Sequence, residues 1–205
     1  MAYFTRAILL AVCLMVLPSQ IFTNTKAIRL VDSIPRPEIE KLYQEADLVA
    51  FVKIVSGDTE NYEDTVYKSS VITAYKGTDV GKSIFFGPYI SYGIGSEYLI
   101  FLEKSGKSIG KIFTKDKETR TVIFDDSSEY FRVMYGGYSI LPVSFECAFG
   151  PVSASDSCGY AVNAETVILP KSLKSYPEET KGEKFSDAFV RKSSIETYLN
   201  ALKKK

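Results

Sequence analysis

The sequence predicts a mainly β fold: a small closed barrel of short strands, with one amphipathic helix before the first strand and another at the C-terminal end packed on it. Short runs of β-branched and aromatic residues alternate with glycine- and proline-containing turns, which is typical of an all-β barrel or sandwich. Segments 48–55 and 97–102 are apolar on both faces, as expected for strands that are covered on both sides. Segments 39–46 and 195–202 carry apolar residues at helical spacing.

Residues 1–20 have the order of a secretory signal peptide. Arg6 supplies the positive charge, residues 7–17 are uninterruptedly apolar, and a polar flank begins at Pro18. The apolar run is too short for a comfortable transmembrane helix, although a buried N-terminal helix is an alternative. We therefore expect cleavage between residues 20 and 27, export to a periplasm or to the cell exterior, and no stable membrane insertion afterwards.

The charge balance disfavours a nucleic-acid partner. Lys+Arg and Asp+Glu are equal at 25 each, and removal of residues 1–20 takes away only Arg6, which leaves a net charge of −1. Neutralisation of phosphates supplies most of the affinity of a nucleic-acid-binding protein, so such proteins carry a basic excess. This chain has none.

The first helix is expected to begin at Pro37, whose missing N–H is harmless in the first turn. Its apolar stripe consists of Ile39, Leu42, Tyr43 and Ala46. The helix leads directly into strand 48–55, in which alternate residues point to opposite faces until Lys53 makes one face polar.

The remaining strands follow from apolar runs and the turns between them. The expected strands, in order, are 65–75 closed by Lys76-Gly77, then 82–86, 97–102, a hairpin of 109–114 and 121–124, 130–142 interrupted at Gly136-Gly137, and a short strand at 166–169. A turn is expected within 104–107. Whether 130–169 completes the barrel or forms a separate flap stays open.

The last helix has a capping box, with Ser193 as N-cap and Glu196 at the third position. Its apolar stripe consists of Ile195, Tyr198, Leu199 and Leu202, and three lysines follow at the C-terminus, where they complement the helix dipole.

The two cysteines that remain after removal of the leader, Cys147 and Cys158, are expected to form a disulfide. An even number of cysteines in an exported chain, separated by glycine, proline and small polar residues, favours one bridge that closes a short loop. A loop of this length corresponds to about 2–3 kcal/mol in the chain-entropy model.

Three segments resemble one known family. They are Tyr-Gln-Glu-Ala-Asp-Leu-Val-Ala-Phe-Val at 43–52, Val-Ile-Thr-Ala-Tyr-Lys-Gly at 71–77 and Gly-Ser-Glu-Tyr-Leu-Ile-Phe-Leu at 95–102. In order and spacing they are similar to the netrin-like class of oligonucleotide/oligosaccharide-binding (OB) barrels, which includes the tissue inhibitors of metalloproteinases and exported bacterial relatives. The resemblance implies an OB-like closed five-stranded barrel in 28–145, with 146–205 (disulfide loop, polar linker and final helix) completing the same domain.

The family's inhibitory chemistry has no counterpart here. The tissue inhibitors chelate a protease's zinc ion through an N-terminal cysteine that is held by a disulfide to a second cysteine just before the Ala-Asp run. Gln44 stands at that second position, and residues 21–146 contain no cysteine. What the resemblance still implies is a scaffold with a loop rim that contacts a protein. The candidate rim residues are Asp58, Glu60, Tyr62, Tyr89 and Tyr92. For the tyrosines near glycines, packing over strand glycines is the preferred interpretation and a partner-binding surface is the other one. These tyrosines are Tyr89, Tyr92, Tyr135 and Tyr138.

No catalytic residue, metal ligand or cofactor is predicted. The chain has no histidine, which removes histidine-dependent nucleophile systems and histidine-containing metal sites. Ser108 and Lys111 have Ser-x-x-Lys spacing, but a turn is the preferred interpretation of so short a pattern. Two acidic sets lack the spacing of a calcium-binding loop. They are Asp58, Glu60, Glu63 and Asp64, and Asp125, Asp126 and Glu129.

Three functions follow, in order of preference. The first is an exported, non-catalytic OB-like module that binds a protein partner, possibly a protease, through its loop rim. The second is inhibition of a metalloendopeptidase without zinc chelation. The third is a carboxylate-based hydrolase of sugars or envelope polymers, which requires two carboxylates that face each other about 5–9 Å apart in one cleft.

Overall fold

A computed structural model describes residues 35–59, 65–88, 92–111, 127–147, 158–176 and 188–204. Its helices are α2 (Ile39–Glu45) and α3 (Lys192–Lys203). Its strands are β1 (Leu48–Thr59), β2 (Thr65–Lys76), β3 (Ser83–Gly87), β4 (Glu97–Ser108), β5 (Glu129–Val133), β6 (Ile140–Glu146), β7 (Gly159–Asn163) and β8 (Phe189–Arg191).

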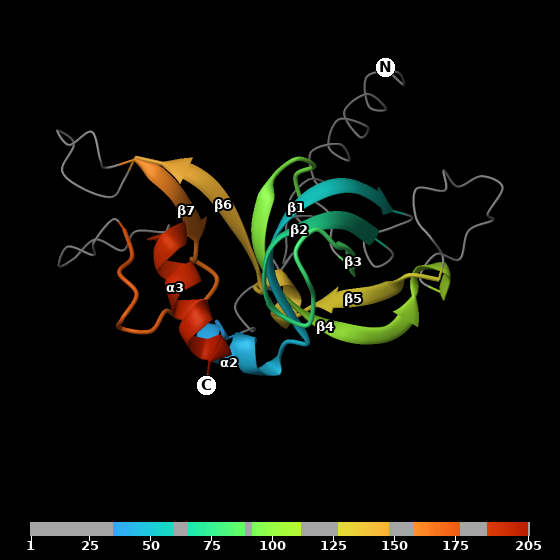
Figure 1. Ribbon diagram of the computed structural model, residues 1–205, viewed down its shortest axis with the longest axis horizontal. Coiled ribbons are helices and arrows are strands. Elements are labelled where there is room, and N and C mark those ends of the chain that lie inside the picture. The colour runs from blue at the N-terminus through green and yellow to red at the C-terminus, as the bar shows by residue number, and fades with distance from the viewer. Residues whose placement is uncertain are drawn as a thin grey trace, which may run out of the picture. The chain divides into compact units, whose positions relative to one another are not determined.

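Strands β1 to β5 close into a barrel (Figure 1). Their order is β1-β2-β3-β5-β4, and β4 pairs again with β1, which leaves no open edge. All of these pairs are antiparallel except β3 with β5, which run parallel. The predicted fold class, an OB-like closed five-stranded barrel with two flanking helices, is confirmed.

The two apolar segments that organise the chain lie side by side, as predicted. β1 and β4 pair antiparallel from Leu48 opposite Leu102 to Lys53 opposite Glu97. Alternation divides each strand between two cores. The residues that face the barrel interior are Leu48, Ala50, Val52, Ile54, Tyr98, Ile100 and Leu102. Those on the outer face are Val49, Phe51, Leu99 and Phe101.

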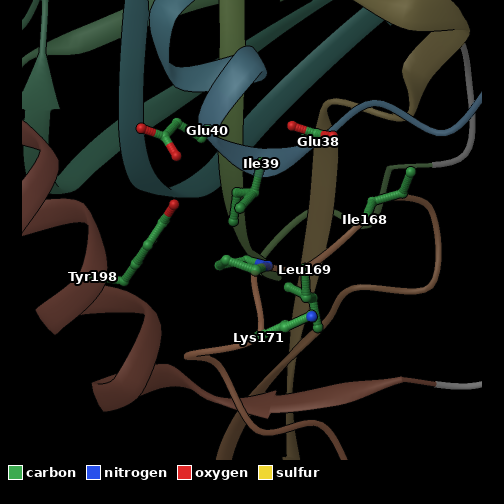
Figure 2. Close-up of a pocket in the computed structure, with 8 residues that line it drawn as sticks. Glu38, Ile39, Glu40, Ile168, Leu169, Lys171 and Tyr198 are labelled. Carbon is green, nitrogen blue, oxygen red and sulfur yellow. The ribbon is translucent and has the colours of Figure 1, made fainter.

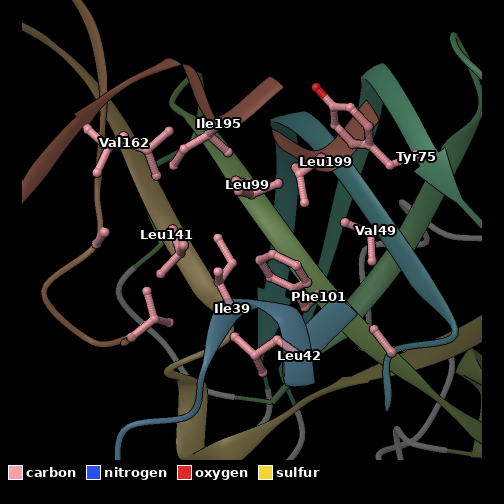
Figure 3. Packing of buried hydrophobic residues seen from close by; sticks show 14 of the residues in the cluster. Ile39, Leu42, Val49, Tyr75, Leu99, Phe101, Leu141, Val162, Ile195 and Leu199 are labelled. Atoms are coloured by element: carbon pink, nitrogen blue, oxygen red, sulfur yellow. The ribbon is translucent and has the colours of Figure 1, made fainter. Parts of the chain in front are cut away.

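The outer face is buried under both helices (Figure 3). Ile39 and Leu42 of α2 and Ile195 and Leu199 of α3 are fully buried in this outer core. Apolar burial contributes about 25 cal/mol per Å², so the stripes of α2 and α3 are stabilised chiefly by this contact rather than by helix propensity.

One edge of β4 is shared by two successive strands. β5 pairs with the C-terminal half of β4, and β6 then pairs with the N-terminal half, with Ile140 opposite Ile100. A 3₁₀ turn at 135–137 separates them, with Tyr135, Gly136 and Gly137 at positive φ. Ser139 is buried there; its hydroxyl accepts the Met134 N–H at 2.9 Å and its carbonyl accepts the Phe101 N–H. The predicted break at the glycine pair is confirmed.

Beyond this break the chain leaves the barrel. β6, β7 and β8 continue the sheet from β4 as antiparallel neighbours, and α3 contacts β2, β7 and β8. Segment 130–169 therefore does both things left open by the sequence: β5 completes the barrel, and β6 and β7 form an outer sheet. The short edge strand β8 is covered at Phe189 by two backbone hydrogen bonds with Tyr176.

Both helix starts differ from the prediction. Pro37 precedes α2 rather than opening it, because its carbonyl accepts the Ile168 N–H at 2.9 Å and holds the chain extended as far as Glu38. In α3 the N-cap is Arg191, without a side-chain cap, and Ser193 lies inside the helix. β8 runs directly into α3, so tertiary pairing sets this boundary instead of a capping box.

Several strand predictions were also wrong in detail. β1 continues to Thr59, and β4 passes through 104–107 with a register shift instead of a turn. Ile109–Lys111 is a 3₁₀ turn, not a strand, whereas 121–124 lies outside the described residues. At 166–169 only an isolated bridge from Ile168 to Glu38 forms.

Gly77, the last residue of the Lys-Gly motif, has a backbone reason to be glycine. Its φ is +68°, and a Cβ there would collide with the backbone carbonyl of Asp47. Lys76 also donates hydrogen bonds from Nζ to the carbonyls of Tyr43 and Gln44, at 3.1 and 3.0 Å. The motif therefore joins the end of β2 to the end of α2.

Candidate functional site

The two described residues of the predicted rim, Asp58 and Tyr92, lie near the end of β1 and in the segment that precedes β4. The backbones of β1 and of the turn before β4 are hydrogen-bonded to each other. The Gly95 N–H donates to the Ile54 carbonyl at 2.8 Å, and the Ile54 N–H donates to the Ser96 carbonyl at 3.1 Å. Two apolar side chains at this end of the barrel remain in solvent: Val55 is 53% exposed and Ile94 is 66% exposed. Val55 lies at an irregularity in the β1–β2 register, beyond the part of β1 that pairs with β4.

Tyr92, a predicted rim residue, packs into an aromatic group at this end of the barrel. Its ring centroid lies 5.2 Å from that of Tyr67, 6.0 Å from that of Phe86 and 5.6 Å from that of Tyr98. Its N–H donates to the Tyr67 hydroxyl, and the Gly93 N–H donates to the Tyr98 hydroxyl at 2.8 Å. Tyr92 is therefore half-buried in this aromatic group, and its role in binding a partner stays a prediction.

Of the other predicted rim residues, only Asp58 lies within the described part of the chain. It stands near the end of β1, and its carboxylate accepts the Thr59 N–H at 2.8 Å. Glu60, Tyr62 and Tyr89 lie outside the described residues. Tyr135, another tyrosine beside glycine, donates from its hydroxyl to Glu45.

The residues considered for metal or nucleophile chemistry do not come together where they are described. Glu129 pairs with Lys104 at 3.6 Å, whereas Asp125 and Asp126 lie outside the described residues. Across the described ranges, no group of three or more His, Cys, Asp or Glu side chains is placed to hold a metal ion. Ser108 ends β4, and the following 3₁₀ turn contains Lys111.

A hollow of about 220 Å³ lies between the start of α2, segment 168–171 and α3 (Figure 2). Tyr198 points from α3 toward Glu40, while Glu38 lies on the other side of Ile39. Burial raises the pKa of Tyr198, and the Glu40 carboxylate, which accepts its hydrogen bond, raises that pKa further, followed by Glu38. The two carboxylates flank Ile39 instead of facing each other, so this hollow lacks the opposed pair that glycoside hydrolysis requires.

An exposed aromatic pair was not anticipated from the sequence. Phe145 on β6 and Tyr160 on β7 lie directly opposite each other, with ring centroids 5.6 Å apart in an edge-to-face arrangement. They are 63% and 62% exposed. The predicted disulfide from Cys147 to Cys158 joins the two strands just beyond this pair and is confirmed. Alternating apolar residues on both sides of the two cysteines are the signal from which this hairpin could have been predicted.

Beside Tyr160 lies a hollow of about 410 Å³ at the start of α3. It is also lined by Gly159, Arg191, Lys192, Ser193 and Glu196. Lys192 binds Glu97 at 3.1 Å, and its ammonium lies 4.7 Å from the ring centroid of Phe51 and 6.0 Å from that of Tyr160. The Lys192 ammonium thus lies between a buried ring of the outer core and one ring of the exposed pair.

Among the described residues, no helix is both long enough and apolar enough to cross a membrane. A scan of the chain against protein-family models finds no match, and searches of curated proteins and of solved structures find no significant match. The netrin-like resemblance therefore depends on the sequence motifs alone.

Proposed function

We propose that this chain is an exported, non-catalytic OB-like module that binds a protein partner through the rim of its barrel. The observation that carries the proposal is the exposure of two apolar side chains, Val55 and Ile94, on segments that are joined at this end of the barrel by the backbone hydrogen bonds of Ile54 with Gly95 and Ser96. Exposed apolar side chains surrounded by polar groups favour contact with another protein over contact with water.

The packing of the barrel interior favours binding at the surface over binding inside the barrel. The side chains of β1 to β5 fill it, and the aromatic group around Tyr92 occupies the rim end. A rigid barrel wall is also a suitable base for binding loops. Export is supported by the signal-like residues 1–20 and by the disulfide between Cys147 and Cys158, since such bonds persist in oxidising compartments.

The experiment is affinity capture from the extracytoplasmic fraction of the source cells with the mature protein as bait. The bait is compared with a Val55→Ser/Ile94→Ser variant and with Val80→Ser as a matched control. Val80 is 66% exposed in the turn between β2 and β3, at the opposite end of the barrel. We expect a reproducible partner that the rim variant loses and the control keeps. Capture that all three baits share, or no reproducible capture, would contradict the proposal.

Two further measurements test its parts separately. Mass spectrometry of the purified mature protein is expected to place the N-terminus between residues 20 and 27; an intact N-terminus would exclude export by signal cleavage.

Inhibition of a metalloendopeptidase is the narrower form of the same proposal. Titration of the mature protein against a panel of these enzymes tests it, and unchanged activity at micromolar protein would remove it without affecting the broader one.

A further inference from the structure

The exposed pair Phe145 and Tyr160 continues the apolar face that elsewhere forms the outer core. Leu141 and Val143 on β6 and Val162 on β7 belong to the same face by alternation, and all three pack in or against the outer core. α3 covers this face only as far as its first residue, Lys192, whose ammonium lies over Tyr160. The apolar face therefore extends beyond α3, and Phe145 and Tyr160 lie on the part that α3 does not cover.

Two adjacent aromatic side chains that are more than half exposed indicate a candidate contact surface. Phe and Tyr dominate interface energetics because each buries a large rigid area at a low entropic cost. Here the register of β6 and β7 fixes both rings, and a disulfide closes the hairpin immediately beyond them. The pair is therefore preorganised for contact, which reduces the cost of ordering it in a complex.

The charges around the pair are of both signs. Lys192 and Glu97 bind each other at 3.1 Å within the chain, and the hollow is also lined by one further cation, Arg191, and one further carboxylate, Glu196. A strongly acidic or basic partner gains nothing from such a surface. A surface with both signs next to an apolar centre is complementary to itself, since a two-fold axis brings cations of one copy near carboxylates of the other. The mature chain has a net charge of only −1, so long-range repulsion opposes the approach of a second copy very little.

We propose that this corner, formed by Phe145, Tyr160 and the adjoining hollow at the start of α3, binds a second copy of the chain. The contact is isologous: the aromatic pair of one copy packs against that of the other, and Arg191 of each copy approaches Glu196 of its partner. The inference does not depend on the rim proposal. β6 and β7 extend from the barrel on one side, and β1 ends on the other (Figure 1).

The first test is the mass of the purified mature protein in solution, measured by sedimentation equilibrium over about 5–500 µM, the range for a small interface of modest affinity. We expect the mass to rise from one chain toward two. Phe145→Ser/Tyr160→Ser should raise the dimer dissociation constant at least about tenfold, since both central side chains are truncated. Val80→Ser should leave it unchanged. Far-UV circular dichroism verifies that each variant is folded. A wild-type mass of one chain throughout, or a dimer that the double variant retains, would overturn the proposal.

A charge swap tests the pairing between copies. Arg191→Glu and Glu196→Arg each place like charges opposite each other across the two-fold axis, so each variant alone should dimerise more weakly than the wild type. An equimolar mixture of the two should form the mixed dimer more strongly than either variant pairs with itself, because opposite charges then meet between chains. Equal association in the mixture and in the separate samples would contradict the proposed contact.

Discussion

At the scale of single residues, Tyr75 is the side chain whose environment predicts the clearest change in stability. It is 3% exposed, and its hydroxyl has no hydrogen-bond partner among the described residues. Removing an unpaired buried hydroxyl while keeping the ring should stabilise the fold, so Tyr75→Phe is expected to raise the free energy of unfolding by about 1 kcal/mol. Urea denaturation measures this. Tyr67→Phe is the matched control. The Tyr67 hydroxyl accepts the Tyr92 N–H, so this variant should have a free energy of unfolding about 1 kcal/mol lower than the wild type.

The same side chain gives a pH dependence. Burial raises the pKa of Tyr75, and the negative charge of Glu196 raises it further. A phenol whose pKa is raised by folding contributes stability that is complete below its unfolded pKa of about 10 and is lost as the pH rises above that value. Tyr75→Phe lacks this loss, so its stability advantage over the wild type should widen between about pH 9 and pH 11. An advantage that stays constant across this range would show that Tyr75 does not titrate as a buried phenol.

At the scale of elements, α3 is held by one buried stripe. Leu199 is fully buried in the outer core, whereas Asn200, the next residue, is exposed. Leu199→Ala is expected to destabilise the protein by about 2–5 kcal/mol, because it removes buried methyl groups and leaves a cavity. Asn200→Ala changes the same helix without touching the core and should be neutral or slightly stabilising, since alanine is the better helix former. Equal midpoints for the two variants in urea would contradict the packing of α3 described above.

The disulfide belongs to the same scale, since it closes the β6–β7 hairpin over a sequence separation of 11 residues. Cys147→Ser/Cys158→Ser should lower the free energy of unfolding by about 2–3 kcal/mol, because the unfolded chain without the cross-link has access to more conformations. The wild type in reductant serves as the control and should match the double variant, which reductant should not change. A double variant as stable as the oxidised wild type would show that strand pairing alone holds the hairpin.

The elements could be predicted where an apolar pattern extends over several turns or strand residues. They could not be predicted where pairing with a neighbouring strand sets the start or the existence of an element. The stripes Ile39–Leu42 and Ile195–Leu199 and the two faces of 48–55 follow from spacing alone. The start of α3 does not, because β8 fixes the backbone up to Arg191 and overrides the capping box at Ser193. β7 and β8 are five and three residues long and form strands only through their neighbours, so the exposed pair at Phe145 and Tyr160 was missed with them.

At the scale of the whole molecule, the barrel interior and the outer core share two strands. β1 and β4 place alternate side chains in the barrel interior and in the outer core, so neither core can open without exposing the other face of the same strands. Their apolar pattern made this arrangement the most predictable feature of the fold. The number of strands in the closed barrel was expected from the family resemblance rather than from periodicity. The order of the strands was not predicted, because it depends on contacts far apart in the sequence.

This sharing predicts that the described unit unfolds as one. Leu141 is fully buried in the outer core, on a strand outside the barrel. If the cores are coupled through β4, Leu141→Ala should lower the protection of backbone amides against hydrogen exchange by the same free energy, about 2–5 kcal/mol, in β2 of the barrel and in β7 of the outer sheet. Native-state hydrogen exchange at low denaturant measures both sets of amides in one sample. Protection that falls in β7 while β2 keeps its wild-type value would mean that the outer sheet opens independently and that the two faces of β4 are not energetically linked.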